Sequence, residues 1–103
     1  MLVKITNDSL QEYDYGTVVI DFGATWCGPC TRFAPVFAIS CVEHAEYTHL
    51  TVDVDANPGL AKKFNIMSVP TVVITTDGNE VGRIGNPGTL VALKKFIYET
   101  LAD

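Results

Sequence analysis

The chain has 103 residues, of which 48% are hydrophobic and 18% are charged, and its formal net charge is −5. This length predicts a single globular domain, residues 1–103, and the composition excludes a disordered chain. The negative charge argues against nucleic-acid binding, which needs clustered Lys and Arg. No apolar run reaches the ~20 residues of a membrane span, and the N-terminus lacks an apolar secretory segment. We therefore expect a soluble, cytoplasmic protein.

Hydrophobic periodicity predicts strands that alternate with helices and end in a hairpin and a closing helix. In chain order we expect a strand at 2–5, a short helix at 9–13, a buried strand at 18–22, a helix whose apolar stripe extends from 33 to 44, a strand at 47–54, a short helix from 58 to 64, a buried strand at 71–76, its hairpin partner at 80–84 and a helix at 90–101 capped by Thr89. The order β-α-β-α-β-α-β-β-α implies an α/β fold with a mixed sheet of about five strands and helices on both faces.

Cys27 and Cys30 form a Cys-x-x-Cys pair at the point where the buried strand at 18–22 gives way to a helix. Free N–H groups at a helix N-terminus stabilise a thiolate. We therefore expect Cys27 to be exposed, to have a lowered pKa and to be the nucleophile. Cys30 lies within disulfide reach and would resolve the mixed disulfide. Pro29 suits the first helical turn, and Gly28 lets a substrate backbone pass close to the sulfurs.

Zinc binding is the main alternative for these cysteines. With Cys41 and His44, the pair gives a C-x₂-C-x₁₀-C-x₂-H pattern, which is close to the spacing of structural zinc sites. A helix between Cys30 and Cys41 would separate them by about eleven steps of 1.5 Å, or ~16 Å. Four zinc ligands must instead lie within ~2.3 Å of one ion. We therefore expect no metal, with Cys41 in the core and His44 at the helix end.

The segment Trp26-Cys27-Gly28-Pro29-Cys30, with Ala34-Pro35 after it, resembles the active-site segment of the thioredoxin family. The likeness continues at Val52-Asp53-Val54-Asp55, at Asn57-Pro58 and at Val69-Pro70-Thr71, and so covers nearly the whole chain. It implies a thioredoxin fold and a protein-disulfide reductase that acts as a general electron carrier in cell redox homeostasis. It also implies a monomer with no cofactor except its redox-active disulfide, disulfide-bearing protein substrates and a thioredoxin reductase as partner.

The resemblance assigns Asp21 as a buried carboxylate that exchanges a proton with Cys30. The residues support this independently, because an Asp inside an apolar strand is desolvated and its pKa should be raised. Three positions depart from the common family pattern. Gly23 stands where an aromatic residue is frequent, and Thr31 and Thr51 each stand where Lys is frequent. Losing a lysine beside Asp21 should make that carboxyl harder to ionise.

The resemblance also implies a substrate-binding surface around the cysteines. Pro70 would follow a cis peptide bond, and the backbone of Val69 would pair with an extended substrate segment. Trp26 would cover the site, and Gly85 would lie near the substrate groove. The alternative hypothesis is that the chain is a binding or scaffold subunit of a larger assembly, which has the same fold and whose redox activity is incidental.

Overall fold

Strands and helices follow one another in the predicted order in the computed structural model, which describes residues 1–102. The elements are β1 (Leu2–Ile5), a 3₁₀ turn η1 (Gln11–Tyr13), β2 (Thr17–Gly23), α1 (Gly28–Glu43), β3 (Thr48–Asp53), α2 (Pro58–Lys63), β4 (Thr71–Thr76), β5 (Asn79–Gly85) and α3 (Leu90–Leu101). The prediction is confirmed to within a few residues, except that the first helix is only the 3₁₀ turn. No helix in this part of the chain has the length and apolar character needed to cross a membrane.

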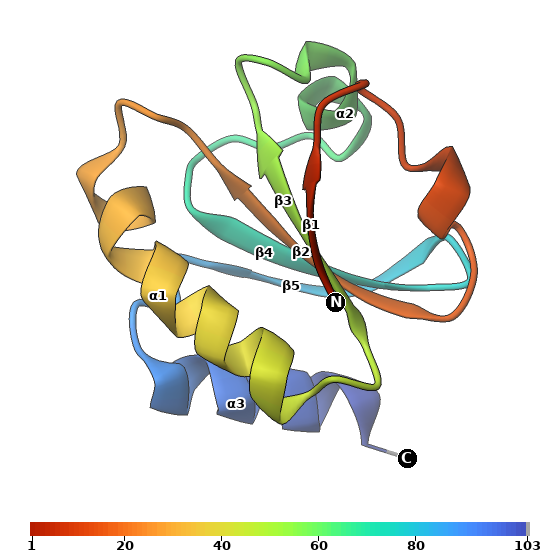
Figure 1. The fold of residues 1–103 in the computed structure, drawn as a ribbon, viewed down its shortest axis with the longest axis vertical. Helices are drawn as coiled ribbons and strands as arrows, with labels where there is room; N and C mark the ends of the chain where they lie inside the picture. The colour runs from red at the N-terminus through yellow and green to blue at the C-terminus, as the bar shows by residue number, and fades with distance from the viewer. Residues whose placement is uncertain (103) are drawn as a thin grey trace.

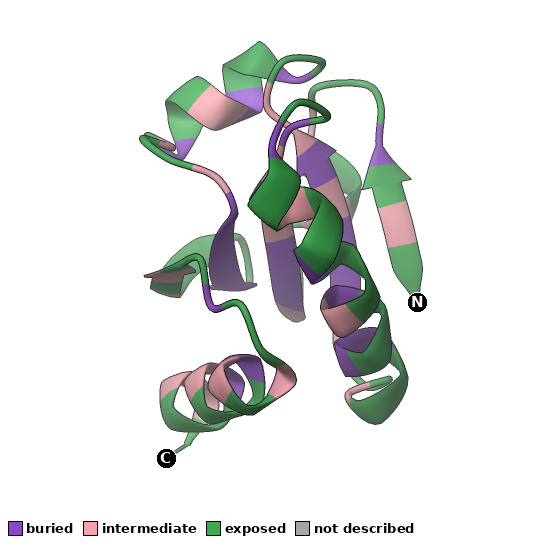
Figure 2. Cartoon of the chain, turned by 90° about the vertical axis from the view of Figure 1, so that its left-hand side faces the viewer, coloured by how far each residue is buried: buried purple, intermediate pink, exposed green. Residues whose placement is uncertain are grey.

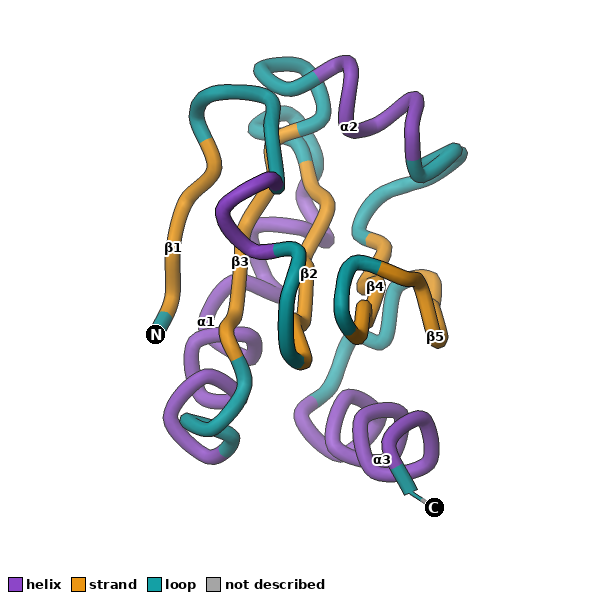
Figure 3. The backbone as a smooth tube through the Cα atoms, turned by 90° about the vertical axis from the view of Figure 1, so that its right-hand side faces the viewer, coloured by secondary structure: helices purple, strands orange, loops and turns teal. Residues whose placement is uncertain are grey.

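The strands form one mixed sheet in the order β1-β3-β2-β4-β5 (Figure 3). β1, β3 and β2 are parallel, whereas β4 is antiparallel to β2, and β5 is antiparallel to β4. α1 and α3 lie side by side on one face of the sheet, and α2 lies on the other (Figures 1 and 3). This is the predicted α/β architecture, with β2 as its central strand.

β2 packs into a separate apolar layer on each face of the sheet, because successive side chains of a strand point to opposite faces. Val18, Ile20 and Phe22 pack with Leu60 and Phe64 beneath α2. On the opposite face, Val19 packs with Phe33 and Phe37 of α1 and with Leu93 and Ile97 of α3. Figure 2 shows that the buried residues, in purple, are concentrated on the central strands and on the sheet-facing sides of the helices. Asp21 and Gly23 follow Val19 on the α1 face, so this alternation carries them toward the start of α1.

A polar pair is buried within the layer beneath α1. Ser40 on α1 and His49 on β3 are both 0% exposed, and Ser40 Oγ lies 3.0 Å from His49 Nε2. His49 Nδ1 lies 3.0 Å from the Tyr47 carbonyl oxygen, which can only accept, so Nδ1 carries the proton and Nε2 accepts from the Ser40 hydroxyl. Burial lowers the pKa of His49 and keeps its ring neutral. The hydrogen bond therefore fixes α1 against β3.

Ser40→Ala leaves the buried Nε2 of His49 without a donor, and we expect it to lower the free energy of unfolding by about 1–3 kcal/mol. The double variant Ser40→Ala/His49→Leu removes both polar groups and should recover part of that loss. Urea unfolding of the three proteins at pH 7.5 measures both effects. Equal stability of Ser40→Ala and the parent chain would contradict the assigned hydrogen bond.

Candidate active site

Cys27 and Cys30 are joined by a disulfide at the start of α1, with their Cα atoms 5.2 Å apart. Cys27 is the N-cap residue of α1, in extended conformation, and the backbone N–H of Cys30 donates to Cys27 Sγ at 3.1 Å. A sulfur that accepts an N–H at a helix N-terminus is stabilised as a thiolate. The structure therefore supplies the electrostatic environment that the sequence predicts for a nucleophile at Cys27.

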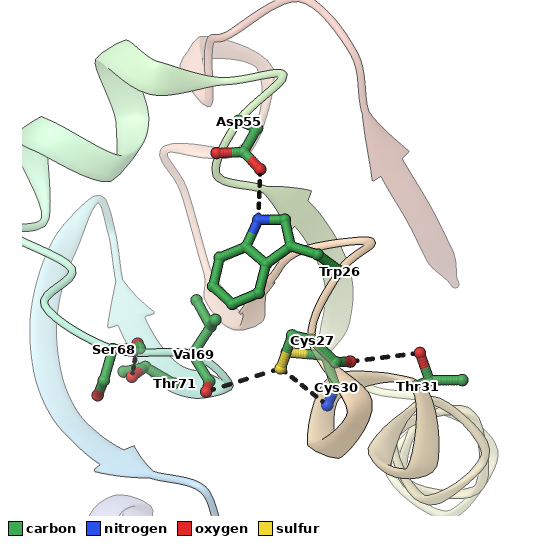
Figure 4. Close-up of a disulfide and its surroundings, with 8 residues drawn as sticks. All are labelled: Trp26, Cys27, Cys30, Thr31, Asp55, Ser68, Val69 and Thr71. Atoms are coloured by element: carbon green, nitrogen blue, oxygen red, sulfur yellow. Dashed lines mark hydrogen bonds between the residues drawn. A yellow bond between two sulfur atoms is a disulfide. The ribbon is translucent and has the colours of Figure 1, made fainter.

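The predicted exposure of Cys27 is wrong. Cys27 is only 5% exposed, whereas Cys30 is half-buried. Cys27 is covered because its Sγ faces the backbone of Val69, whose carbonyl oxygen lies 3.8 Å away (Figure 4). Cys30 is less covered because Gly23 has no side chain: a Cβ at that position would lie 3.4 Å from Cys30 Sγ. The two sulfurs of one disulfide thus face different surroundings.

The loop that faces Cys27 is fixed by hydrogen bonds on both sides. The Val69–Pro70 peptide bond is cis, as the family resemblance implies. Thr71 Oγ1 donates to the Ser68 carbonyl at 2.7 Å, and the N–H of Asn86 donates to the Pro70 carbonyl at 2.8 Å. Gly85 lies opposite Thr71 in the β4–β5 register, which places it beside this loop. The structure therefore brings Val69, Pro70 and Gly85 to the same end of the sheet as the disulfide, where β2 and β5 finish and β4 begins.

Trp26 lies next to the disulfide, with its indole ring between the sulfurs and Asp55, and the residue is 70% exposed (Figure 4). Its Nε1 donates to Asp55 Oδ2 at 2.8 Å, and the N–H of Asp55 in turn donates to Asp53 Oδ1 at 2.8 Å. Asp55, the partner that orients the indole, was not predicted from the sequence. A signal was available, because Trp26 and Asp55 follow the carboxyl ends of adjacent parallel strands. Gly28 and Pro29 are exposed beside Trp26 in the first turn of α1.

Asp21 lies on the α1 face of β2, behind the disulfide. Burial raises the pKa of its carboxyl group from the usual 3.8 to about 7, and its Oδ1 has no hydrogen-bond partner among the described residues. Asp21 and Cys30 line one cleft of about 290 Å³, together with Thr51, which lies opposite Asp21 in the β2–β3 register. A carboxyl group with a pKa near 7 is suited to exchanging protons at neutral pH.

Cys41 and His44 lie apart from this site, at the far end of the same helix. Cys41 is a free thiol, 9% exposed, as expected of a core residue. His44 is the C-cap residue of α1, and its ring stacks on Tyr47 with the centroids 6.0 Å apart. α1 is a continuous helix from Gly28 to Glu43, so it separates Cys30 from Cys41 as expected. Within residues 1–102, no group of three or more His, Cys, Asp or Glu side chains could hold a metal ion.

Asp21→Asn should stabilise the protein at alkaline pH and have little effect at acidic pH. The raised pKa means that the folded state favours the protonated carboxyl, so its stabilising contribution is complete below pH ~4 and is lost as the pH rises through about 7. Above that pH, removing the charge should increase the free energy of unfolding by ~2–4 kcal/mol. Denaturant unfolding at pH 4.5 and pH 8.5 measures the difference. A gain that is the same at both pH values would contradict the shifted pKa.

Comparisons with known proteins agree with this geometry. The thioredoxin family model matches residues 3–99. Thioredoxin from Mycolicibacterium smegmatis is 39% identical over 96% of this chain and 94% of its own, and thioredoxin from Staphylococcus haemolyticus is 39% identical over 81% of this chain and 82% of its own. The structure of reduced Schistosoma mansoni thioredoxin pre-protein superposes with a TM-score of 0.86 at 30% identity and covers 97% of this chain and 98% of its own. Fasciola hepatica thioredoxin superposes with a TM-score of 0.82 at 33% identity, over 97% of this chain and 99% of its own. The chain therefore belongs to the thioredoxin family of thiol–disulfide oxidoreductases.

Proposed function

We propose that the chain reduces disulfides of protein substrates by attack from Cys27 and resolution by Cys30. The Cys27 thiolate bonds to one substrate sulfur, and the other substrate sulfur leaves as a thiolate. The Cys30 thiolate then attacks Cys27 Sγ, which releases the second substrate thiolate and leaves the Cys27–Cys30 disulfide. The N–H of Cys30 that donates to Cys27 Sγ carries this proposal, because it stabilises negative charge on Cys27.

Asp21 is assigned as the group that exchanges a proton with Cys30. Both side chains line the same cleft, and the pKa of about 7 lets the carboxylate accept the thiol proton near neutral pH. Cys30 must lose its proton before it can attack Cys27, since the thiolate is the nucleophile. Asp21 therefore assists the resolving step, by accepting the proton of Cys30, and takes no part in the first attack by Cys27.

The substrate is assigned to the surface in front of Cys27. Val69 is half-buried, its carbonyl oxygen lies beside Cys27 Sγ, and its backbone can pair with an extended substrate segment by main-chain hydrogen bonds. The remaining residues assigned to this surface are Trp26, Gly28, Pro29, Pro70 and Gly85. Trp26 offers a large apolar ring whose orientation Asp55 fixes.

The proposed electron carrier is a single domain, residues 1–103, that works as a monomer with no cofactor besides its disulfide. One copy of the chain carries the thiols, the carboxyl group and the loop that the exchange uses. A thioredoxin reductase would return the disulfide to the dithiol after each turnover. A reductase of protein disulfides needs a compartment that supplies reducing equivalents. We therefore propose that the protein works in the cytoplasm. Nothing in the described part of the chain favours the scaffold alternative.

Cys27→Ser should abolish reduction of insulin disulfides, because serine supplies no thiolate for the first attack. Cys30→Ser should instead accumulate mixed disulfides at Cys27, since the resolving thiol is gone. Insulin turbidity in the presence of dithiothreitol measures turnover, and mass spectrometry detects the trapped adducts. Retained turnover in Cys27→Ser would overturn the proposed roles. Cys41→Ser is the matched control and should keep full activity.

Thr51→Lys should lower the pKa of Asp21, because a cation opposite the carboxyl in the β2–β3 register favours its ionised form. We expect the acidic limb of the pH–rate profile to move down by about one unit. The shift belongs to the coupled titration of Asp21 and Cys30 rather than to either group alone. Thr51→Val removes the hydroxyl without adding charge and should leave the profile in place. An unchanged profile in Thr51→Lys would show that position 51 does not act on this carboxyl.

A further inference from the structure

Asp55, the hydrogen-bond partner of Trp26, lies in the loop that follows β3. Its Oδ2 accepts the indole N–H at 2.8 Å, and Figure 4 shows the indole between this carboxyl group and the disulfide. Both residues are exposed, so the hydrogen bond must offset the entropy that is lost when the two side chains are ordered. That cost is smaller if Asp55 is already fixed before the bond forms. The orientation of the indole therefore depends on what holds Asp55.

Asp53, the last residue of β3, holds this part of the loop with its side chain. Its Oδ1 accepts the backbone N–H of Asp55 at 2.8 Å and that of Ala56 at 3.3 Å. An Asp side chain that accepts the N–H two residues ahead closes an Asx turn, which takes the place of a backbone turn. This Asx turn fixes the backbone of Asp55, and with it the direction in which the Asp55 side chain leaves the chain.

The ends of the Asx turn are anchored by bonds that do not involve the Asp53 carboxyl group. The N–H of Val54 donates to the Gly23 carbonyl of β2 at 2.9 Å. Asn57, which is 0% exposed, donates its backbone N–H to the Asp53 carbonyl at 2.9 Å and its side-chain N–H to the same oxygen at 3.1 Å. Losing the bonds of the Asp53 carboxyl group should therefore free Asp55 while the loop stays attached to the sheet.

We propose that Asp53 is a positioning residue for the binding of protein substrates. Its carboxyl group fixes Asp55, Asp55 fixes the indole of Trp26, and an ordered indole loses less entropy when a substrate packs against it. Asp53 acts on the substrate through these two side chains. The inference rests on the proposed function, which assigns Trp26 to the substrate surface, and it adds a residue that controls KM from outside that surface.

Asp53 also lines the cleft that contains Asp21 and Cys30, so its negative charge offers a second way to affect the reaction. A pair of conservative variants separates the two effects. Asp53→Asn keeps an acceptor oxygen in the place of Oδ1 and removes the charge, whereas Asp53→Glu keeps the charge and moves the oxygens away by one methylene group. A residue that acts through the Asx turn tolerates the first change and not the second. A residue that acts through its charge shows the reverse.

Initial rates of insulin reduction, measured over a range of insulin concentrations with dithiothreitol as the reductant, give KM and kcat for each variant. We expect Asp53→Glu to raise KM about threefold to tenfold and to leave kcat within about twofold of the parent value. Asp53→Asn should match the parent in both constants. Asp77→Glu is the matched control and should change neither, because Asp77 Oδ1 likewise accepts a backbone N–H, from Gly16 at 2.8 Å, but lies at the opposite end of the sheet.

The fluorescence of Trp26 reports the mobility of the indole directly, because Trp26 is the only tryptophan in the chain. In the reduced protein, Asp53→Glu should lower the steady-state anisotropy and make the indole easier to quench with acrylamide. Asp55→Ala should have the same effect, since it removes the acceptor itself. Asp53→Asn should keep the parent values. Parent-like anisotropy and quenching in Asp53→Glu would contradict the inference.

A double-variant cycle tests whether Asp53 acts through the indole. Trp26→Phe keeps an aromatic ring and removes the N–H that Asp55 accepts. In that background, Asp53→Glu should change KM by less than about 1.5-fold. An equal rise of KM in both backgrounds, or a larger effect of Asp53→Asn than of Asp53→Glu, would overturn the inference. Failure of the unmodified chain to reduce insulin would instead overturn the proposed function.

Discussion

The burial of β2 between two apolar layers is the constraint on which the site depends. Its even-numbered side chains pack beneath α2 and Val19 packs beneath α1, so a shift of one residue would exchange the two faces. This alternation carries Asp21 toward the start of α1 and leaves it little contact with water. The strand then ends at Gly23, and α1 begins a few residues later. The position of the disulfide and the proton affinity of Asp21 thus have one structural cause.

The surroundings of Cys27 stabilise a negative charge, whereas those of Asp21 oppose one. Cys27 Sγ receives an N–H donor and the favourable end of a helix dipole, whereas Asp21 is desolvated and one of its oxygens has no described partner. The first arrangement stabilises a thiolate and the second keeps a carboxyl group protonated up to about pH 7. When Cys27 becomes part of a mixed disulfide, its negative charge disappears from the site. Ionisation of Asp21 or Cys30 is then less opposed, so the first attack prepares the resolving step.

The sequence predicts the fold well, because most of the relevant signals are local. Short, nearly continuous apolar runs identify β2 and β4, and the capping residue Thr89 accepts the N–H of Ala92 at the start of α3 as expected. The missed features depend on contacts between distant segments. The partner of Trp26 is 29 residues away, and periodicity cannot show which sulfur a loop will cover. Its place at the start of a helix predicted an exposed Cys27, but the residue is only 5% exposed, and its sulfur faces the Val69 carbonyl.

The backbone conformation at Gly23 does not require glycine, so another effect of the missing side chain must be considered. It lies in the extended strand β2, its φ is outside the left-handed region, and a Cβ would meet Cys30 at ordinary contact distance. Where the backbone allows it, replacing glycine by alanine typically stabilises a fold by about 0.4–1 kcal/mol, so a larger residue would be the more stable choice. What glycine changes is the cover over Cys30 Sγ. Because the Val69 carbonyl faces the other sulfur at 3.8 Å, the two ends of the disulfide have different surroundings.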